Sequence, residues 1–223
     1  MGQIHIVDPK GKRRYEPCLA GIRGYGFLLV FCGHYFFPSE MAEPHTIRFQ
    51  FLTVLSSLGL FAVPTFFVLS GYLIGGILFH TRNREGFFKV FYFRRMLRVF
   101  PVYYVTLIAI GVFYIIKRIP IDSHYWTYFL YIQNVLPGST DGHSFPVAMI
   151  HFWSLAVEEQ FYLLFPLVIC LFRDRQTLIK IVTALIGVCF LVRIAGPFLS
   201  LSASEMSYFT PTRVDAILMG VLL

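Results

Sequence analysis

The chain has 223 residues, of which 57% are hydrophobic and only 14% are charged. A soluble domain usually carries about 25% charged residues, so this composition excludes an ordinary soluble globular protein. The formal net charge is +7, but the Lys and Arg residues gather between apolar runs, as in the cytoplasmic loops of membrane proteins. We therefore expect an all-α, polytopic helical protein that contacts the lipid bilayer and binds no nucleic acid.

Residues 1–17 are polar and basic, and they lack the early apolar segment of a cleavable signal peptide. By the positive-inside rule we expect this basic arm, and with it the N-terminus, to be cytoplasmic. The first span is predicted at about 18–37, and Pro38 then opens a loop that should be external. The four cysteines are scattered through apolar segments without CxxC spacing, so we expect neither a disulfide framework nor a metal site.

The second span is predicted from residues 49–81, which contain no Asp, Glu, Lys or Arg. This run is longer than one straight span requires. Pro64 and the small residues around it indicate a kinked or tightly packed helix; these small residues are Ser70, Gly71, Gly75 and Gly76. The most basic loop of the chain is expected next, at about 82–98, and should be cytoplasmic.

The third span is predicted at about 99–116. The segment 125–136 is apolar and aromatic but short, and two interpretations are open: a fourth span or a re-entrant piece. If it spans, the later loop with Arg173, Arg175 and Lys180 falls outside, against the positive-inside rule. If it does not, that loop is cytoplasmic.

Two further spans are predicted at about 150–172 and 178–199, and an apolar run begins again at 216–223. Eight residues cannot cross a bilayer, which needs about 20. The expected architecture is therefore about six spans plus the start of another, and we expect the sequence to be truncated.

Arg23 and His34 lie eleven residues apart on the predicted first span. In an α-helix this separation is three full turns plus about 20°, so both side chains share one face with a rise of about 16 Å. A lone histidine on an apolar face is more often a satisfied core residue. An arginine on the same face favours a functional histidine, because polar groups in spans face the protein interior or a cavity.

Two adjacent carboxylates, Glu158 and Glu159, interrupt the apolar run 151–172. A charged residue at the centre of a membrane helix costs about 2.5–3.5 kcal/mol on insertion scales, so such residues are usually functional. A carboxylate near His34 could hold that histidine as a general base that activates a hydroxyl. The alternative is a buried carboxylate paired structurally with an arginine elsewhere.

Arg94, Arg95 and Arg98 form a basic cluster whose spacing of three and four residues would gather them on one side of a helix. Such a cluster can bind phosphates through charge-assisted hydrogen bonds. Taken alone, the cluster is better explained as a positive-inside anchor at anionic lipid headgroups.

Five segments, in this order, resemble the acyltransferase 3 family of membrane O-acyltransferases. They are the Arg23–His34 pair, FFVLSGYLI at 66–74, RRMLRVFP at 94–101, WSLAVEEQFYLLFP at 153–166 and RVDAILMG at 213–220. The resemblance covers about 18–223, which it identifies as one transmembrane acyltransferase domain. Family members generally continue to about ten spans, so the resemblance implies that the C-terminal part of the fold is missing here.

The resemblance implies transfer of an acyl group, often acetyl, from cytoplasmic acyl-CoA to a hydroxyl of a sugar in an envelope polysaccharide or glycolipid. It further implies an integral protein of the plasma (inner) membrane. His34, Arg23, Glu158 and Glu159 match the family's catalytic groups. Arg94, Arg95 and Arg98 match its basic CoA motif, and we expect Ser70, Gly71 and Trp153 to contact substrate.

A second function class remains open on the residues alone. Arg23, His34 and the two glutamates could form a proton relay through the membrane in a proton-coupled transporter or exporter. The basic cluster at 94–98 favours the enzyme, because a CoA-dependent enzyme needs a phosphate site and a pump does not.

Overall fold

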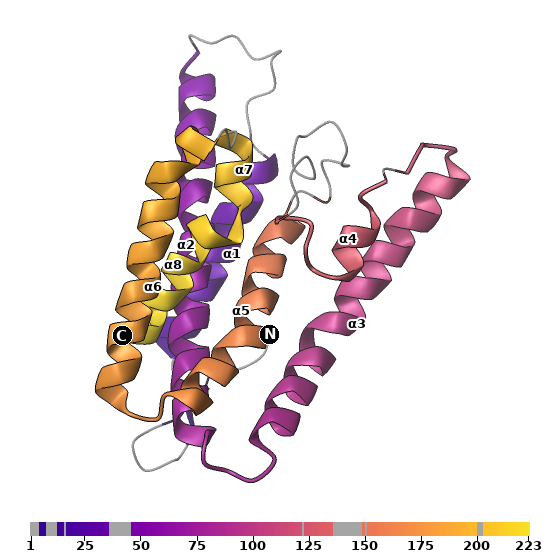
Figure 1. Ribbon diagram of the computed structural model, residues 1–223. Coiled ribbons are helices and arrows are strands. Elements are labelled where there is room, and N and C mark those ends of the chain that lie inside the picture. The colour runs from indigo at the N-terminus through magenta and orange to yellow at the C-terminus, as the bar shows by residue number, and fades with distance from the viewer. Residues whose placement is uncertain are drawn as a thin grey trace. The chain divides into compact units, whose positions relative to one another are not determined.

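The structure is a computed structural model, and it describes residues 5–7, 13–15, 17–35, 46–121, 123–135, 149, 151–199 and 203–223. The chain divides into two compact units, and Figure 1 labels their helices. The first contains residues 1–80 and 216–223, and the second contains residues 81–215. Each unit is described separately.

The first unit begins with a small antiparallel hairpin of β1 (His5–Val7) and β2 (Arg13–Tyr15), in which His5 pairs with Tyr15. The predicted basic arm therefore contains two short strands. Helix α1 (Pro17–Tyr35) follows, close to the expected first span, and α2 (Ile47–Thr81) follows α1. Apart from the hairpin, the described residues form helices and their connections, which confirms the expected helical class.

Helix α2 is one continuous helix of 35 residues with Pro64 inside it. Gly71 and Gly75 of this helix serve close packing, as the sequence predicted, whereas nothing lies within 4 Å of a Cβ added at Gly76. A Cβ added at Gly71 would overlap the backbone carbonyl of Ile217, and one added at Gly220 would overlap the carbonyl of Val68. Glycines thus allow α2 and the end of α8 (Thr210–Leu222) to approach backbone to backbone, a common device between membrane helices.

The second unit begins with α3 (Phe87–Ile116), whose start corrects the prediction of a basic loop at 82–98. Gly86 adopts the left-handed conformation (φ 67°) immediately before the helix. Lys and Arg are good helix formers and can extend their charged ends towards water, so basic residues need not end a helix. At 1.5 Å per residue, α3 is about 45 Å long, more than the ~30 Å hydrocarbon core.

Of the two interpretations left open for 125–136, a fourth span does not hold for the described part, residues 123–135. This segment contains only a single helical turn, α4 (Trp126–Phe129), between other turns. The phenol of Tyr103 in α3 donates to the Tyr128 carbonyl at 2.8 Å, and the side chain of Gln133 donates to the Phe152 carbonyl at 3.0 Å. The segment is therefore held against α3 through one of its backbone carbonyls and against α5 through the Gln133 side chain.

The remaining elements of the second unit are α5 (Phe152–Leu171), α6 (Arg175–Ala195), the 3-10 turn η2 (Gly196–Leu199), α7 (Ala203–Tyr208) and the beginning of α8. Asp174 caps the N-terminus of α6 by accepting from the Thr177 amide at 2.8 Å. A cluster of buried residues packs α3, α4 and α5 together, and consists of Tyr103, Leu107, Tyr128, Tyr131, Met149 and Ala156.

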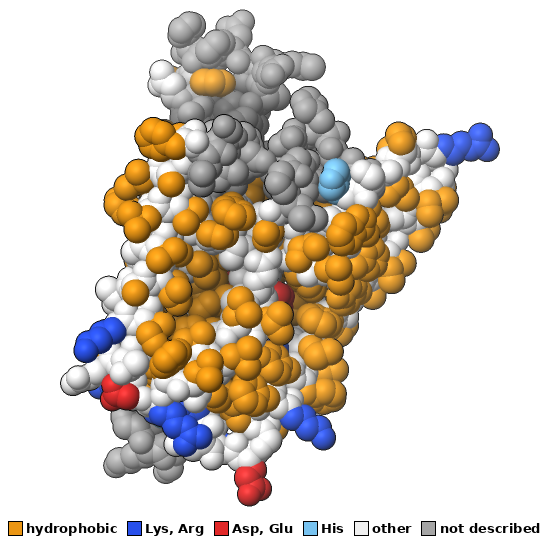
Figure 2. Space-filling view, viewed as in Figure 1, with side chains coloured by type: hydrophobic (Ala, Val, Ile, Leu, Met, Phe, Trp, Pro, Cys, Tyr) orange, Lys and Arg blue, Asp and Glu red, His pale blue; other side chains and the backbone are white. Residues whose placement is uncertain are grey.

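Four helices of the described part are long and apolar enough to cross a membrane: Ser57–Thr81, Phe87–Ile116, Phe152–Leu171 and Arg175–Phe198. A shorter apolar helix covers Pro17–Phe31. Hydrophobic side chains cover most of the visible surface of α3 (Figure 2), where Val102 and Ile116 are each 72% exposed. Such exposure suits contact with lipid. The expected total of about six spans is not reached among the described residues.

Candidate functional site

Arg95 of α3 lies against both carboxylates of α5. Its Nη2 atom is 3.6 Å from Oε2 of Glu158, and its Nε atom is 3.5 Å from Oε1 of Glu159. The three side chains are 14%, 17% and 12% exposed, respectively. One guanidinium thus neutralises part of a carboxylate pair inside the second unit, which is the structural pairing that the sequence left open as an alternative.

The ring of Tyr162 supports the same guanidinium. The Cζ atom of Arg95 lies 3.6 Å from the ring centroid, a close cation–π contact. Tyr162 follows Glu158 by four residues, so both side chains leave the same side of α5. The WSLAVEEQFY segment therefore supplies two carboxylates and an aromatic face to one arginine of α3.

Tyr131, beside α4, adds a buried hydroxyl near the carboxylates. Its side chain is 7% exposed, and its oxygen has no hydrogen-bond partner in the described structure. Burial and the nearby charge of Glu159 raise the pKa of Tyr131 above the ordinary value for a phenol. The phenol therefore stays protonated at neutral pH and can donate a hydrogen bond.

A closed ring of polar side chains lies behind the carboxylates, formed by Gln160, Asn134 and Thr210. The Nε2 atom of Gln160 donates to Oδ1 of Asn134 at 2.9 Å, and Nδ2 of Asn134 donates to the Thr210 hydroxyl at 2.7 Å. The Thr210 hydroxyl donates to Oε1 of Gln160 at 2.5 Å. The ring joins α5, the turn after α4 and the start of α8.

The polar ring was not predicted, although one signal was present. Gln160 is an uncharged polar residue within an apolar helix, and such a group requires a partner where water is absent. Its partners lie 26 and 50 residues away, so sequence spacing could not identify them.

The three arginines of the basic cluster do not form one patch. Arg95 turns to the carboxylates, whereas Arg94 and Arg98 are exposed in the first half of α3. Adjacent helical residues point about 100° apart, which separates Arg94 from Arg95. Contact of these residues with acyl-CoA stays a prediction.

Arg23 and His34 both lie on α1, as predicted. The side chain of His34 is outside the described residues, so its pairing with a glutamate stays a prediction. Ser70 and Gly71 lie in the second half of α2, and Ser70 is buried. Their contact with substrate also stays a prediction.

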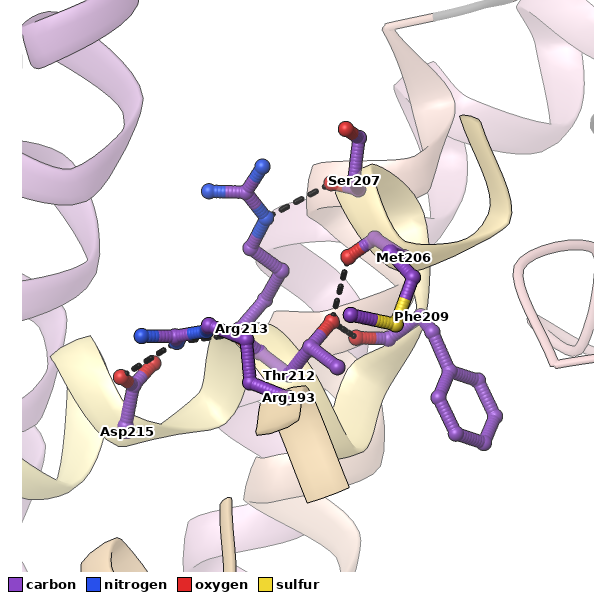
Figure 3. Close-up of polar contacts among 7 residues, drawn as sticks. All are labelled: Arg193, Met206, Ser207, Phe209, Thr212, Arg213 and Asp215. Carbon is purple, nitrogen blue, oxygen red and sulfur yellow. Dashed lines mark hydrogen bonds and ion pairs between the residues drawn. The ribbon is translucent and has the colours of Figure 1, made fainter. Parts of the chain in front are cut away.

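Trp153 lies in the first turn of α5, and its ring is 5.4 Å from that of Tyr208 in α7, centroid to centroid. The end of α6 and the start of α8 hold a second group of charges, Arg193, Arg213 and Asp215 (Figure 3), and Cζ of Arg213 lies 5.8 Å from the centroid of the Trp153 ring. Arg193 at the end of α6 donates from Nη2 to Oδ2 of Asp215 at 2.7 Å and to the Thr212 carbonyl at 2.5 Å. The described residues hold no group of three or more potential metal ligands.

A family model described as an acyltransferase domain matches residues 16–219. Peptidoglycan O-acetyltransferase OatA of Listeria monocytogenes is 30% identical over 95% of the chain and 34% of its own length. A Staphylococcus aureus protein whose name gives O-acetyltransferase as a provisional function is 29% identical over 95% of the chain and 35% of its own length.

An uncharacterized protein of Haemophilus influenzae is 30% identical over 71% of the chain and 71% of its own length. No solved structure matches the chain. The chain spans about a third of the length of the O-acetyltransferase relatives described above.

Proposed function

Because this chain belongs to the acyltransferase 3 family, which its match over residues 16–219 shows, we propose that it is the membrane part of an O-acyltransferase. The enzyme would move an acetyl group from cytoplasmic acetyl-CoA to a hydroxyl of an envelope polysaccharide or glycolipid. The family match is the observation that carries the proposal. Two of the relatives have names that contain the term O-acetyltransferase, and this supports acetyl as the group transferred.

The carboxylate pair supports chemistry inside the second unit. Arg95, Glu158 and Glu159 form a group of two carboxylates and one guanidinium. Such a group can stabilise a cation that forms during a reaction. General-base activation of a hydroxyl would produce a protonated histidine, and the family resemblance makes His34, which belongs to the first unit, our candidate for the base.

In the proposed reaction the acceptor hydroxyl oxygen attacks the thioester carbonyl, and His34 takes the hydroxyl proton. The carbon–sulfur bond breaks, CoA leaves as a thiolate, and the proton is passed to it. The ester remains on the sugar. Arg95, enclosed by carboxylates and Tyr162, suits a positioning role for the acidic pair. Among the basic cluster, we assign the phosphate contact of CoA to the exposed Arg94 and to Arg98.

The arrangement of α3 and α5 supports a proposal for which end of the second unit faces the cytoplasm. The phenol of Tyr92, near the start of α3, donates to the carbonyl of Leu163 in the second half of α5 at 2.8 Å. The two helices therefore run antiparallel, so the basic turns before α3 and after α5 lie at one end (Figure 1). The positive-inside rule makes this the cytoplasmic end, in the plasma (inner) membrane, where acetyl-CoA is available.

The test is transfer of label from acetyl-CoA in membranes that carry the full-length protein. His34→Ala should abolish labelling of the lipid or polysaccharide fraction, and Lys117→Ala, an exposed residue at the end of α3, should leave it unchanged. Transfer that persists in His34→Ala would show that the base lies elsewhere. Absence of transfer by folded, unmodified protein with several acyl donors would instead favour the proton-coupled transporter.

A further inference from the structure

We propose that Arg213, with Trp153 beside it, forms a binding site for the anionic group of a sugar, either a carboxylate or a phosphate. This inference rests on the proposed function, because it adds a property of the sugar acceptor. It concerns a residue that belongs to neither the carboxylate pair nor the basic cluster.

The guanidinium of Arg213 is held by one backbone contact. Its Nε atom donates to the carbonyl of Ser207 at 2.7 Å, while its two terminal nitrogens extend away from that carbonyl (Figure 3). No carboxylate of the described residues forms an ion pair with it, since the nearby Asp215 pairs with Arg193. A forked donor with two open nitrogens is the geometry that binds a carboxylate or phosphate in a bidentate manner.

The charges around Arg213 also require an anion. Arg193 and Arg213 contribute two positive charges and Asp215 one negative charge, so one positive charge remains in excess among these described residues. Arg213 is partly buried, and an uncompensated charge with reduced access to water is costly. An anionic ligand would complete the group.

An aromatic surface adjoins the guanidinium. The Cζ atom of Arg213 is 5.8 Å from the centroid of the Trp153 ring, and the Tyr208 ring lies against the same indole. Aromatic side chains with a few placed polar groups are typical of small-molecule sites. A sugar offers an apolar face for the indole and, when it carries an acid group, an anion for Arg213.

The position of Arg213 and Trp153 in the second unit separates them from the expected binding site of the acyl donor, acetyl-CoA. It lies where α5 begins and α6 ends. The basic turns lie at the opposite end of these helices. The cytoplasmic phosphates of CoA would be bound there, so the anion at Arg213 belongs to a ligand that approaches from the other side of the membrane.

Ligand binding can be tested independently of catalysis. Saturation-transfer NMR on the full-length protein in detergent would compare glucuronic acid, glucose 1-phosphate and glucose, with inorganic phosphate as competitor. We expect at least one acidic sugar to bind about tenfold or more tightly than glucose, because a charge-assisted hydrogen bond is lost with the neutral sugar. The preferred acidic sugar identifies the anion.

Three variants locate the site. Arg213→Gln should reduce the affinity for the acidic sugar to that for glucose. Trp153→Ala should reduce the affinity for all three sugars. Arg213→Lys keeps the positive charge but not the planar guanidinium, so it should give an intermediate loss of affinity. This variant also serves as a control in case the neutral Arg213→Gln protein misfolds. Lys117→Gln removes one exposed charge elsewhere and should change nothing.

Equal binding of glucose and both acidic sugars would overturn the inference, and so would undiminished binding by Arg213→Gln. If Trp153→Ala has no effect while inorganic phosphate competes fully, the site binds charge alone and the sugar part is wrong. In transfer assays Arg213→Gln should raise the KM for an acidic acceptor more than the KM for acetyl-CoA. Absence of any transfer would contradict the proposed function, while the binding result would stand separately.

Discussion

Arg95 and Glu159 lie across the contact between α3 and α5, with Nε of the arginine 3.5 Å from Oε1 of the glutamate. The two residues are 64 positions apart in the sequence and both are largely withdrawn from solvent. Glu158 approaches the same guanidinium from the preceding position. The adjacent carboxylates of α5 thus share one cation.

Removal of that cation should destabilise the protein. Arg95→Ala removes the guanidinium that Glu158 and Glu159 share, and breaking a buried pair in this way typically costs about 3–5 kcal/mol. We expect a marked fall in the thermal unfolding temperature in detergent. Arg94→Ala removes an exposed arginine one residue away and should stay within about 0.5 kcal/mol of the unmodified protein. Equal stability of the two variants would contradict the pairing.

The polar ring predicts a second effect on stability. Gln160→Ala leaves the Asn134 amide and the Thr210 hydroxyl with fewer partners in a buried place, which costs about 1–3 kcal/mol. The measurement is the free energy of unfolding, with exposed Gln176→Ala on α6 as the matched control. Adding Thr210→Val to Gln160→Ala should cost less than the sum of the single changes, because the residues share one network. If the two changes in the free energy of unfolding were fully additive, Gln160 and Thr210 would not be energetically coupled.

The glycines of α2 allow a matched comparison within one helix. At Gly71 an added methyl group would meet the backbone of Ile217, so Gly71→Ala should separate α2 from the end of α8 and destabilise the protein. At Gly76 nothing lies within 4 Å of an added Cβ, and Ala is the better helix former by about 0.8–1.0 kcal/mol. Gly76→Ala should therefore be neutral or stabilising. Thermal unfolding of both variants in detergent would reveal any reversal of this order.

The start of α6 should depend on pH through Asp174. The hydrogen bond from the Thr177 amide lowers the pKa of Asp174, so its capping contribution is present above the unfolded pKa, about 3.9. This contribution is lost as the pH falls through the lower folded pKa. Hydrogen exchange of the first turn of α6, corrected for intrinsic rates, should show falling protection below about pH 4. Asp174→Asn keeps a capping side chain and should remove this pH dependence; an unchanged profile would show that another group titrates.

Much of the fold followed from the sequence because membrane helices are specified by local composition. The apolar runs predicted α1, α2, α5 and α6, and the predicted limits lie within a few residues of the helix ends. The small residues of α2 predicted close packing, since only small side chains allow helix backbones to approach. The adjacent glutamates marked a functional region because the cost of a charge in a membrane is a property of the residue itself.

The tertiary structure decided which groups meet, because partners in a membrane protein are chosen by packing and not by spacing along the chain. It assigned Arg95 to the glutamates and separated it from Arg94, and it closed the ring of Gln160, Asn134 and Thr210. It also showed that the described part of 125–136 is a turn held to α3 and α5 by hydrogen bonds from side chains to backbone carbonyls. Composition could not show this, because an apolar aromatic segment is equally compatible with lipid and with a protein interior.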